Sequence, residues 1–208
     1  SLWVACEGDA TVRVHDGSNG ALLATLALPI GSAPYGVVFR PDGAAGYVSL
    51  RARGEVVEVD PAARSVVAQL PVGSDPKGLA VTADSQQVLV TRFLSGAAGE
   101  VRRLTTSPFA LAGAVTLAVD AGPDTENSGR GVPNYLSSVT ISPDGLHAWV
   151  PSKKDNVQRG VYRDGLPLTF ESTVRTILSQ LDLATEWQQI VKGVIILAAV
   201  LVQRPERI

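Results

Sequence analysis

A short pattern, Pro-x-Gly followed by apolar residues, constrains the fold of this chain more than any other feature. It occurs at residues 34–39 (PYGVVF) and again 42 residues later at 76–81 (PKGLAV). A third and looser copy begins at Pro133 and runs into residues 139–141 (VTI). A fixed interval of this length marks one supersecondary unit per repeat, and such units bury their faces by stacking on their neighbours.

Each copy leads into a turn, at residues 41–43 (PDG), 83–85 (ADS) and 143–145 (PDG). Pro, Asp and Gly favour successive positions of a tight turn. A short apolar run follows each turn (GYVSL, QVLVTR, HAWVPS), and alternating or β-branched runs such as TVRVHD and EVVEVD complete the unit. Four short strands in about 42 residues are typical of a β-propeller blade.

We therefore predict an all-β fold, a β-propeller of four-stranded antiparallel blades. About three and a half blades are expected within residues 1–185, at residues 2–30, 36–72, 78–119 and 136–183. An incomplete ring exposes blade faces and strand edges. We expect the chain to be a fragment of a longer protein, or to need partner chains to close; a compact four-bladed ring is the alternative.

The second strands of the units carry a family resemblance. Residues 47–49 (YVS), 89–91 (LVT) and 149–151 (WVP) resemble the YVTN motif of bacterial YVTN-repeat propellers, over roughly residues 2–183. The third copy departs from the motif at Pro151, and the second unit lacks the turn Pro and Gly. The resemblance implies a periplasmic or secreted protein, with any targeting segment outside this chain.

Composition limits the partners and the chemistry. With 208 residues, 45% of them hydrophobic, the chain is able to build a packed core. A net charge of −2 provides no global basic field, so we expect no nucleic-acid partner and no membrane partner. The single cysteine, Cys6, excludes an internal disulfide and a Cys-based zinc site, and it is expected in the core. Trp3, Tyr47 and Trp149 are also expected to pack in the core.

Two insertions interrupt the repeat, at residues 121–134 and 152–173. The first connects the last strand of one blade to the first strand of the next, and the second connects the second and third strands of a blade. Because neighbouring strands alternate in direction, both connections leave the blades on the same face. Long loops of this kind are often functional. We expect this face to bind a protein partner or a small ligand.

The second insertion is locally basic in an acidic protein. The residues that we predict to bind a partner are Lys153, Lys154, Asp155, Asn156, Arg159, Arg163 and Asp164. The first insertion carries Asp124, Glu126 and Arg130. The alternative is that these charges are solvated and form weak surface pairs.

The run PSKKDNVQRG…RDG…LTF…TVR resembles a subgroup of extracytoplasmic propellers found with di-haem cytochrome c peroxidase-like domains. This resemblance implies that the basic loop docks or neighbours a redox module. The chain has no haem-binding motif of its own, and we predict no cofactor.

No catalytic or metal-binding residue is predicted. The strings GxSxG, HExxH and GxxxxGK[ST] do not occur, and His15 and His147 fall on different blades. The stretch DAGPDTENSG from Asp120 offers oxygen ligands for calcium, without the spacing of an EF-hand. Some related propellers are lactonases, but no residue carries that activity over to this sequence.

We predict a binding or scaffold module that presents long loops to its ligand. The alternative is the propeller portion of a haem-linked oxidoreductase or a lactonase-like hydrolase, so whether the chain is an enzyme stays open.

The C-terminal segment, residues 186–208, does not follow the repeat. Residues 187–202 are predicted to form a helix, and their apolar run, residues 194–202, is much shorter than the roughly 20 residues of a membrane span. We expect the helix to pack against the exposed edge or face of the propeller. The segment also resembles the last helix of ribose-type sugar ABC permeases, which implies a composite chain.

Overall fold

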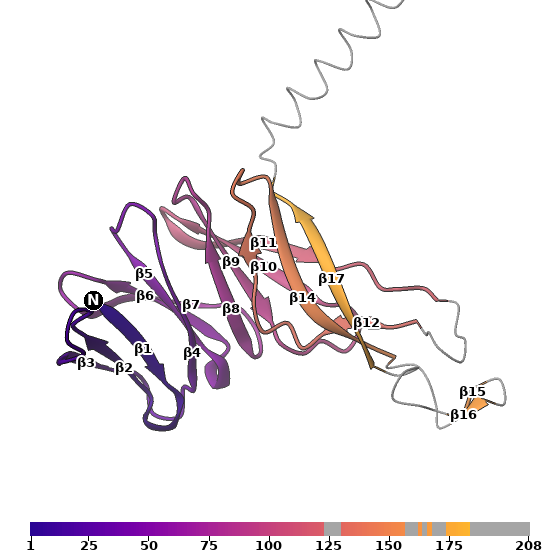
Figure 1. Ribbon diagram of the computed structural model, residues 1–208, viewed down its shortest axis with the longest axis horizontal. Coiled ribbons are helices and arrows are strands. Elements are labelled where there is room, and N and C mark those ends of the chain that lie inside the picture. Colours follow the sequence, from indigo (N-terminus) through magenta and orange to yellow (C-terminus); the bar gives the residue numbers. More distant parts are fainter. Residues whose placement is uncertain (123–129, 157–161, 164–165, 168–173, 184–208) are drawn as a thin grey trace, which may run out of the picture.

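The computed structural model describes residues 1–122, 130–156, 162–163, 166–167 and 174–183, and Figure 1 shows its sheets standing side by side in sequence order. The predicted C-terminal helix and the likeness of residues 186–208 to a permease lie outside the described residues. Among those described, no helix has both the length and the apolar character needed to cross a membrane.

Three sheets follow the predicted repeat, each an antiparallel set with its strands in chain order. The first contains β1 (Leu2–Cys6), β2 (Thr11–His15) and β3 (Leu22–Ala27). The second contains β4 (Pro34–Phe39), β5 (Gly46–Leu50), β6 (Glu55–Asp60) and β7 (Ser65–Pro71). The third contains β8 (Pro76–Val81), β9 (Gln87–Arg92), β10 (Glu100–Thr106) and β11 (Phe109–Thr116). Short 3-10 turns, η1 (Glu7–Asp9) and η2 (Arg51–Arg53), follow β1 and β5.

The fourth sheet departs from this plan at its innermost strand, which is divided in two. It contains β12 (Val132–Asn134), β13 (Thr140–Ile141), β14 (His147–Asp155) and β17 (Val174–Asp182). Both β12 and β13 pair with β14, which pairs on its other side with β17. A separate two-stranded hairpin is formed by β15 (Tyr162–Arg163) and β16 (Leu166–Pro167). These sheets confirm the predicted fold class, a partial β-propeller of four-stranded antiparallel blades.

The prediction that the third copy of the repeat pattern begins at Pro133 is wrong. In the second and third sheets, the residue before the innermost strand has a positive φ, at Ala33 (50°) and Asp75 (49°). In the fourth sheet the positive φ falls on Tyr135 (58°). Leu136, and not Pro133, therefore takes the place of Pro76. Pro133 instead lies in β12, an additional strand that pairs with the far end of β14.

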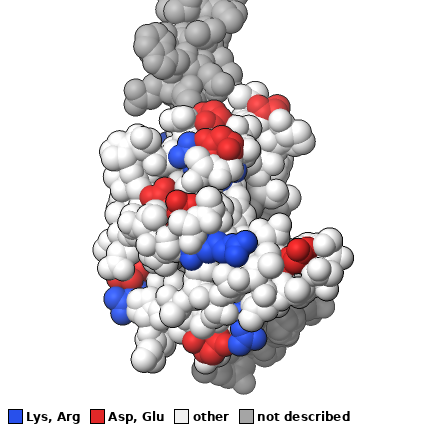
Figure 2. Space-filling view, turned by 90° about the vertical axis from the view of Figure 1, so that its left-hand side faces the viewer, with Lys and Arg blue, Asp and Glu red and all other residues white. Residues whose placement is uncertain are grey.

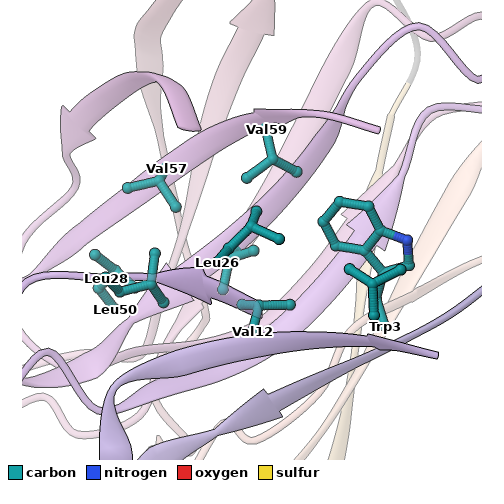
Figure 3. Close-up of a cluster of buried hydrophobic side chains, with 9 residues drawn as sticks. Trp3, Val12, Leu26, Leu28, Leu50, Val57 and Val59 are labelled. Carbon is teal, nitrogen blue, oxygen red and sulfur yellow. The ribbon is translucent and has the colours of Figure 1, made fainter. Parts of the chain in front are cut away.

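The core lies between the sheets. Figure 3 shows the cluster that joins the first two sheets, in which Trp3, Val12 and Leu26 face Val57 and Val59. Similar clusters join the second sheet to the third and the third sheet to the fourth.

Two aromatic residues occupy the core as expected, and two other residues differ from the prediction. Trp3 is 9% exposed and Tyr47 is fully buried. Cys6 is only half-buried, because alternation along β1 puts it on the side opposite Trp3, away from the second sheet. Trp149 is also half-buried, on the side of β14 that faces away from the third sheet.

The Pro-x-Gly pattern has a steric cause. A Cβ atom on Gly36 would lie 2.5 Å from the carbonyl oxygen of Lys77, and one on Gly78 would lie 2.6 Å from the Cα of Ser138. Each innermost strand therefore passes very close to the innermost strand of the next sheet. Only glycine permits that approach.

A hydroxyl group on β5 and another on β9 complete the contact between each of these sheets and the next. The hydroxyl of Ser49 accepts a hydrogen bond from the N–H of Gly36 (2.9 Å) and donates one to the carbonyl of Lys77 (2.8 Å). The hydroxyl of Thr91 likewise accepts from Gly78 (2.9 Å) and donates to Leu136 (2.7 Å). The Ser or Thr of the strand motif thus joins two strands of its own sheet to the next sheet.

Candidate functional site

Six side chains lie at the end of the sheets where the innermost strands begin and the second strands end. Three of them occupy equivalent positions on the second strands. Arg51 and Phe93 directly follow the last residues of β5 and β9, and Lys153 lies near the end of the longer β14. Tyr35 and Lys77 stand between the Pro and the Gly of the repeat pattern. The sixth is Tyr135, at the positive-φ position. We call these six residues the axial row, since β4, β8 and β13 contact one another in turn.

Cations and aromatic rings alternate along the axial row. The Lys77 ammonium lies 3.2 Å from the centroid of the Phe93 ring and 5.0 Å from that of Tyr35. The Arg51 guanidinium lies 5.8 Å from the centroid of Tyr35, and Lys153 lies 5.1 Å from that of Tyr135. Phe93 and Tyr135 contact each other edge to face at 5.4 Å. Such contacts hold cations in place at about 0.5–2 kcal/mol each.

Arg51 is neutralised within the protein. Its Nε donates to Asp75 (2.8 Å), and a terminal nitrogen of the guanidinium donates to Glu7 (2.9 Å). The hydrogen bond to Asp75 is the main cause that raises the pKa of Arg51. Its charge is therefore already balanced by two carboxylates.

Lys77 differs from Arg51 because its charge is not balanced in the same way. The residue is only 8% exposed, and its ammonium forms no ion pair with a carboxylate of the residues described. Burial is the main cause that lowers the pKa of Lys77, and the nearby charge of Arg51 lowers it further, while the charges of Asp75 and Glu7 act in the opposite direction. A lysine with a perturbed pKa in a cluster of aromatic rings is a candidate for a binding site.

The stems of the two insertions meet beside the axial row. β12 pairs with the last three residues of β14, and Asp120 forms a bridge with Gly131. The ammonium of Lys154 lies 2.6 Å from Asp120. The two long loops therefore leave the fourth sheet next to each other.

The structure divides the predicted partner-binding residues. Lys153 is exposed and belongs to the axial row, whereas Lys154 is 8% exposed and pairs with Asp120 across the loop stems. Lys154 is thus not an exposed docking residue: alternation along β14 turns it inward. Asp155 is half-buried, and burial raises its pKa despite a hydrogen bond from Asn134 (3.3 Å).

Among the remaining predicted residues, Asn156 is half-buried at the end of β14. Arg163 lies in β15. Arg159 and Asp164, like Asp124 and Glu126 of the first insertion, lie outside the described residues.

A shallow groove of about 370 Å³ adjoins the axial row. Its lining includes Phe93, Tyr135, Ser137, Lys153 and Thr176. Three of its seven lining residues belong to the axial row, so the groove offers aromatic surface and a positive charge to a ligand lying over it.

The two histidines belong to β2 and β14, strands of the first and fourth sheets, which stand at opposite ends of the array in Figure 1. His15 bonds the carbonyl of Gly20 (2.9 Å), and His147 lies 3.0 Å from Asp182. Within the described part of the chain, no three His, Cys, Asp or Glu residues form a group able to hold a metal. Most of the calcium-like stretch lies outside that part; Asp120, its first residue, bonds Lys154.

Sequence reasoning missed Tyr35, Arg51, Lys77, Phe93 and Tyr135 as site residues. The available signal was their position in the repeat. Tyr35 and Lys77 lie between the Pro and the Gly of the repeat, and Arg51 and Phe93 directly follow the second strands of their sheets. Tyr135 lies just before the innermost strand of its sheet, outside the Pro-x-Gly pattern.

The fold and the site define the class of protein as a partial β-propeller with a cation–aromatic row at one end of its blades. No family model matches the chain, and no curated protein matches it. Among 490 matching chains of solved structures is the one titled "Kuenenia stuttgartiensis Hydrazine Synthase", with a TM-score of 0.69 and 13% sequence identity. The match covers 88% of this chain and 48% of that one, so this chain spans about half the length of that neighbour. At this identity the likeness shows the fold alone.

Proposed function

We propose that this chain is an extracytoplasmic β-propeller binding module that holds a carboxylate-bearing ligand at the axial row. The observation that carries the proposal is Lys77, a largely buried lysine whose ammonium rests on Phe93 and forms no ion pair with a carboxylate of the described residues. An anion from outside supplies the missing partner. Charge-assisted hydrogen bonds of this kind contribute about 1.5–3 kcal/mol.

The surroundings of Lys77 favour an organic anion over a bare inorganic one. The neighbouring groove combines the Phe93 and Tyr135 rings with the exposed Lys153. Apolar parts of a ligand gain from contact with the rings while its carboxylates pair with the two lysines. The source of the carboxylate is either a free small acid or an acidic segment of a partner protein; a part for Arg159 and Arg163 in binding the second stays a prediction from the sequence.

The experiment is a calorimetric titration of the chain with succinate and, separately, with an oligoglutamate peptide, at low and high salt. We expect binding that weakens with salt, and Lys77→Met to reduce the affinity by at least about tenfold. Arg64→Gln is the matched control, since it removes one positive charge from an exposed turn away from the row.

Preference for succinate indicates a small-acid ligand, and preference for the peptide indicates a protein partner. Absence of binding to both probes, or equal effects of Lys77→Met and Arg64→Gln, contradicts the proposal. Two alternatives, the propeller portion of a haem-linked oxidoreductase and a lactonase-like hydrolase, stay predictions from the sequence, as do the YVTN resemblance and the periplasmic or secreted location.

A further inference from the structure

Two arginines of the third sheet stand where the second sheet has core residues. Arg92 is the last residue of β9, as Leu50 is of β5. Arg102 holds the place on β10 that Val57 holds on β6. Leu50 is fully buried and Val57 is 1% exposed, in the apolar cluster between the first and second sheets. The repeat therefore predicts apolar side chains at the corresponding places between the second and third sheets, where the chain has arginines instead.

The two arginines share a single carboxylate. Glu100 of β10 accepts a hydrogen bond from Arg92 and lies 3.3 Å from a terminal nitrogen of Arg102. The Nε of Arg102 is buried and has no hydrogen-bond partner in the described part of the chain. The group thus carries two positive charges against one negative charge, and it leaves hydrogen-bonding capacity unused.

Other arginines of the described strands and turns are balanced one to one. Three of them have a carboxylate of their own, in the pairs Arg13–Asp9, Arg40–Asp42 and Arg53–Glu55. At the end of the molecule shown in Figure 2, groups of blue and red side chains likewise lie close together. Partly burying an unbalanced charge costs stability, so an excess of charge at a place where packing favours apolar residues is a candidate for a functional site.

The backbone above the two arginines leaves them open to solvent. Gly73 has a φ of 94°, and a Cβ added to it would lie 3.6 Å from the Nε of Arg92 and 3.7 Å from a terminal nitrogen of Arg102. Without a side chain at Gly73, the two guanidinium groups are uncovered on that side. Their side chains keep 21% and 24% of their surface exposed. An exposed hydroxyl, that of Ser74, lies 2.7 Å from Arg92.

We propose that Arg92 and Arg102 form a phosphate-binding site between the second and third sheets, separate from the axial row. A guanidinium group presents its N–H donors in a planar fork that matches the oxygens of a phosphate group. Glu100 offsets one of the two positive charges, and the phosphate offsets the other. The Ser74 hydroxyl is an additional donor at the same place.

The experiment is a calorimetric titration of the chain with inorganic phosphate at neutral pH and low salt. We expect Arg102→Val to weaken phosphate binding by at least about tenfold. Valine is the residue of the second sheet at this place, so the substitution keeps the packing, and Arg92 keeps Glu100 as its partner. Arg13→Gln is the matched control, because it removes one guanidinium from an ion pair on the first sheet and leaves the affinity unchanged.

A second variant separates ligand binding from a structural role of the arginines. Glu100→Gln removes the internal carboxylate that competes with phosphate, so we expect it to strengthen phosphate binding by at least about threefold. A purely structural ion pair gives no such gain.

The proposal is overturned by absence of phosphate binding, by equal effects of Arg102→Val and Arg13→Gln, or by weaker binding to the Glu100→Gln variant. Acetate that binds as tightly as phosphate also overturns it. The titrations with succinate test the axial row through Lys77→Met, so the two proposals fail independently.

Discussion

At the scale of single residues, one hydroxyl in each of the second and third sheets links that sheet to the next. Thr91 is fully buried, and its hydroxyl satisfies both the N–H of Gly78 and the carbonyl of Leu136. This explains why the second strands carry Ser or Thr at this position, a pattern that the sequence displays but whose cause only the structure reveals. In the fourth sheet the position is Pro151, which has no hydroxyl.

Thr91→Val keeps the shape of the side chain and removes the hydroxyl. Two buried backbone groups then lose their partner, so we expect the free energy of unfolding to fall by about 1–3 kcal/mol in urea denaturation. Thr91→Ser keeps the hydroxyl and loses one methyl group, about 1 kcal/mol or less. An equal or larger loss for Thr91→Ser would show that packing, and not the hydrogen bonds, matters here.

Tyr47 makes the folded state sensitive to alkali. Burial, with the nearby charge of Glu58 as a smaller cause, raises the pKa of Tyr47 from 10.0 to about 12. The folded chain therefore keeps a proton that the unfolded chain releases. Stability linked to this proton is complete below pH 10.0 and is lost as the pH rises toward about 12.

We expect the unmodified chain to lose more stability across this pH range than Tyr47→Phe, because the phenylalanine ring has no group to titrate. Urea denaturation of both proteins at several alkaline pH values measures the difference. Parallel pH profiles would mean that Tyr47 titrates at the same pH in the folded and unfolded chains.

At the scale of strands, steric contact explains the sequence pattern that was easiest to see. Gly36 and Gly78 mark the points where one innermost strand touches the next. The glycine occurs in both the second and the third sheets, 42 residues apart, so the constraint was predictable from the sequence. The alignment of the third copy was not, because β12 inserts a second segment ahead of β13 and Leu136 replaces the expected proline.

Gly78→Ala places a methyl group 2.6 Å from the backbone of Ser138, which has no room to move without separating the sheets. We expect a loss of about 1–3 kcal/mol or more in thermal or urea unfolding. Gly96→Ala is the control, since nothing lies within 4 Å of its added Cβ, and it leaves the stability nearly unchanged. Equal stability of the two variants would contradict the close contact between innermost strands.

At the scale of the whole molecule, the sequence predicted the arrangement of blades better than it predicted the site. The periodic spacing of apolar residues in the sequence indicates which side chains pack in the core. Each of the three interfaces between neighbouring sheets is accordingly filled by a cluster of apolar side chains. Residues such as Lys77 lie at the ends of strands, outside that periodicity. The prediction that Lys154 lies in an exposed loop was wrong for a different reason. The charged residues around it are typical of a loop, but Lys154 belongs to β14 and its side chain is buried.

The residues of the axial row are separate from the residues that pack the sheets together. Tyr35, Arg51, Lys77, Phe93 and Lys153 lie outside the three apolar clusters that hold the sheets together. Different side chains at these places therefore change what the end of the blades attracts while the blades keep their packing. A combinatorial library restricted to these positions is therefore a route to propellers that bind new ligands while the packing between the sheets stays the same. Each blade would contribute its own side chains to the binding surface.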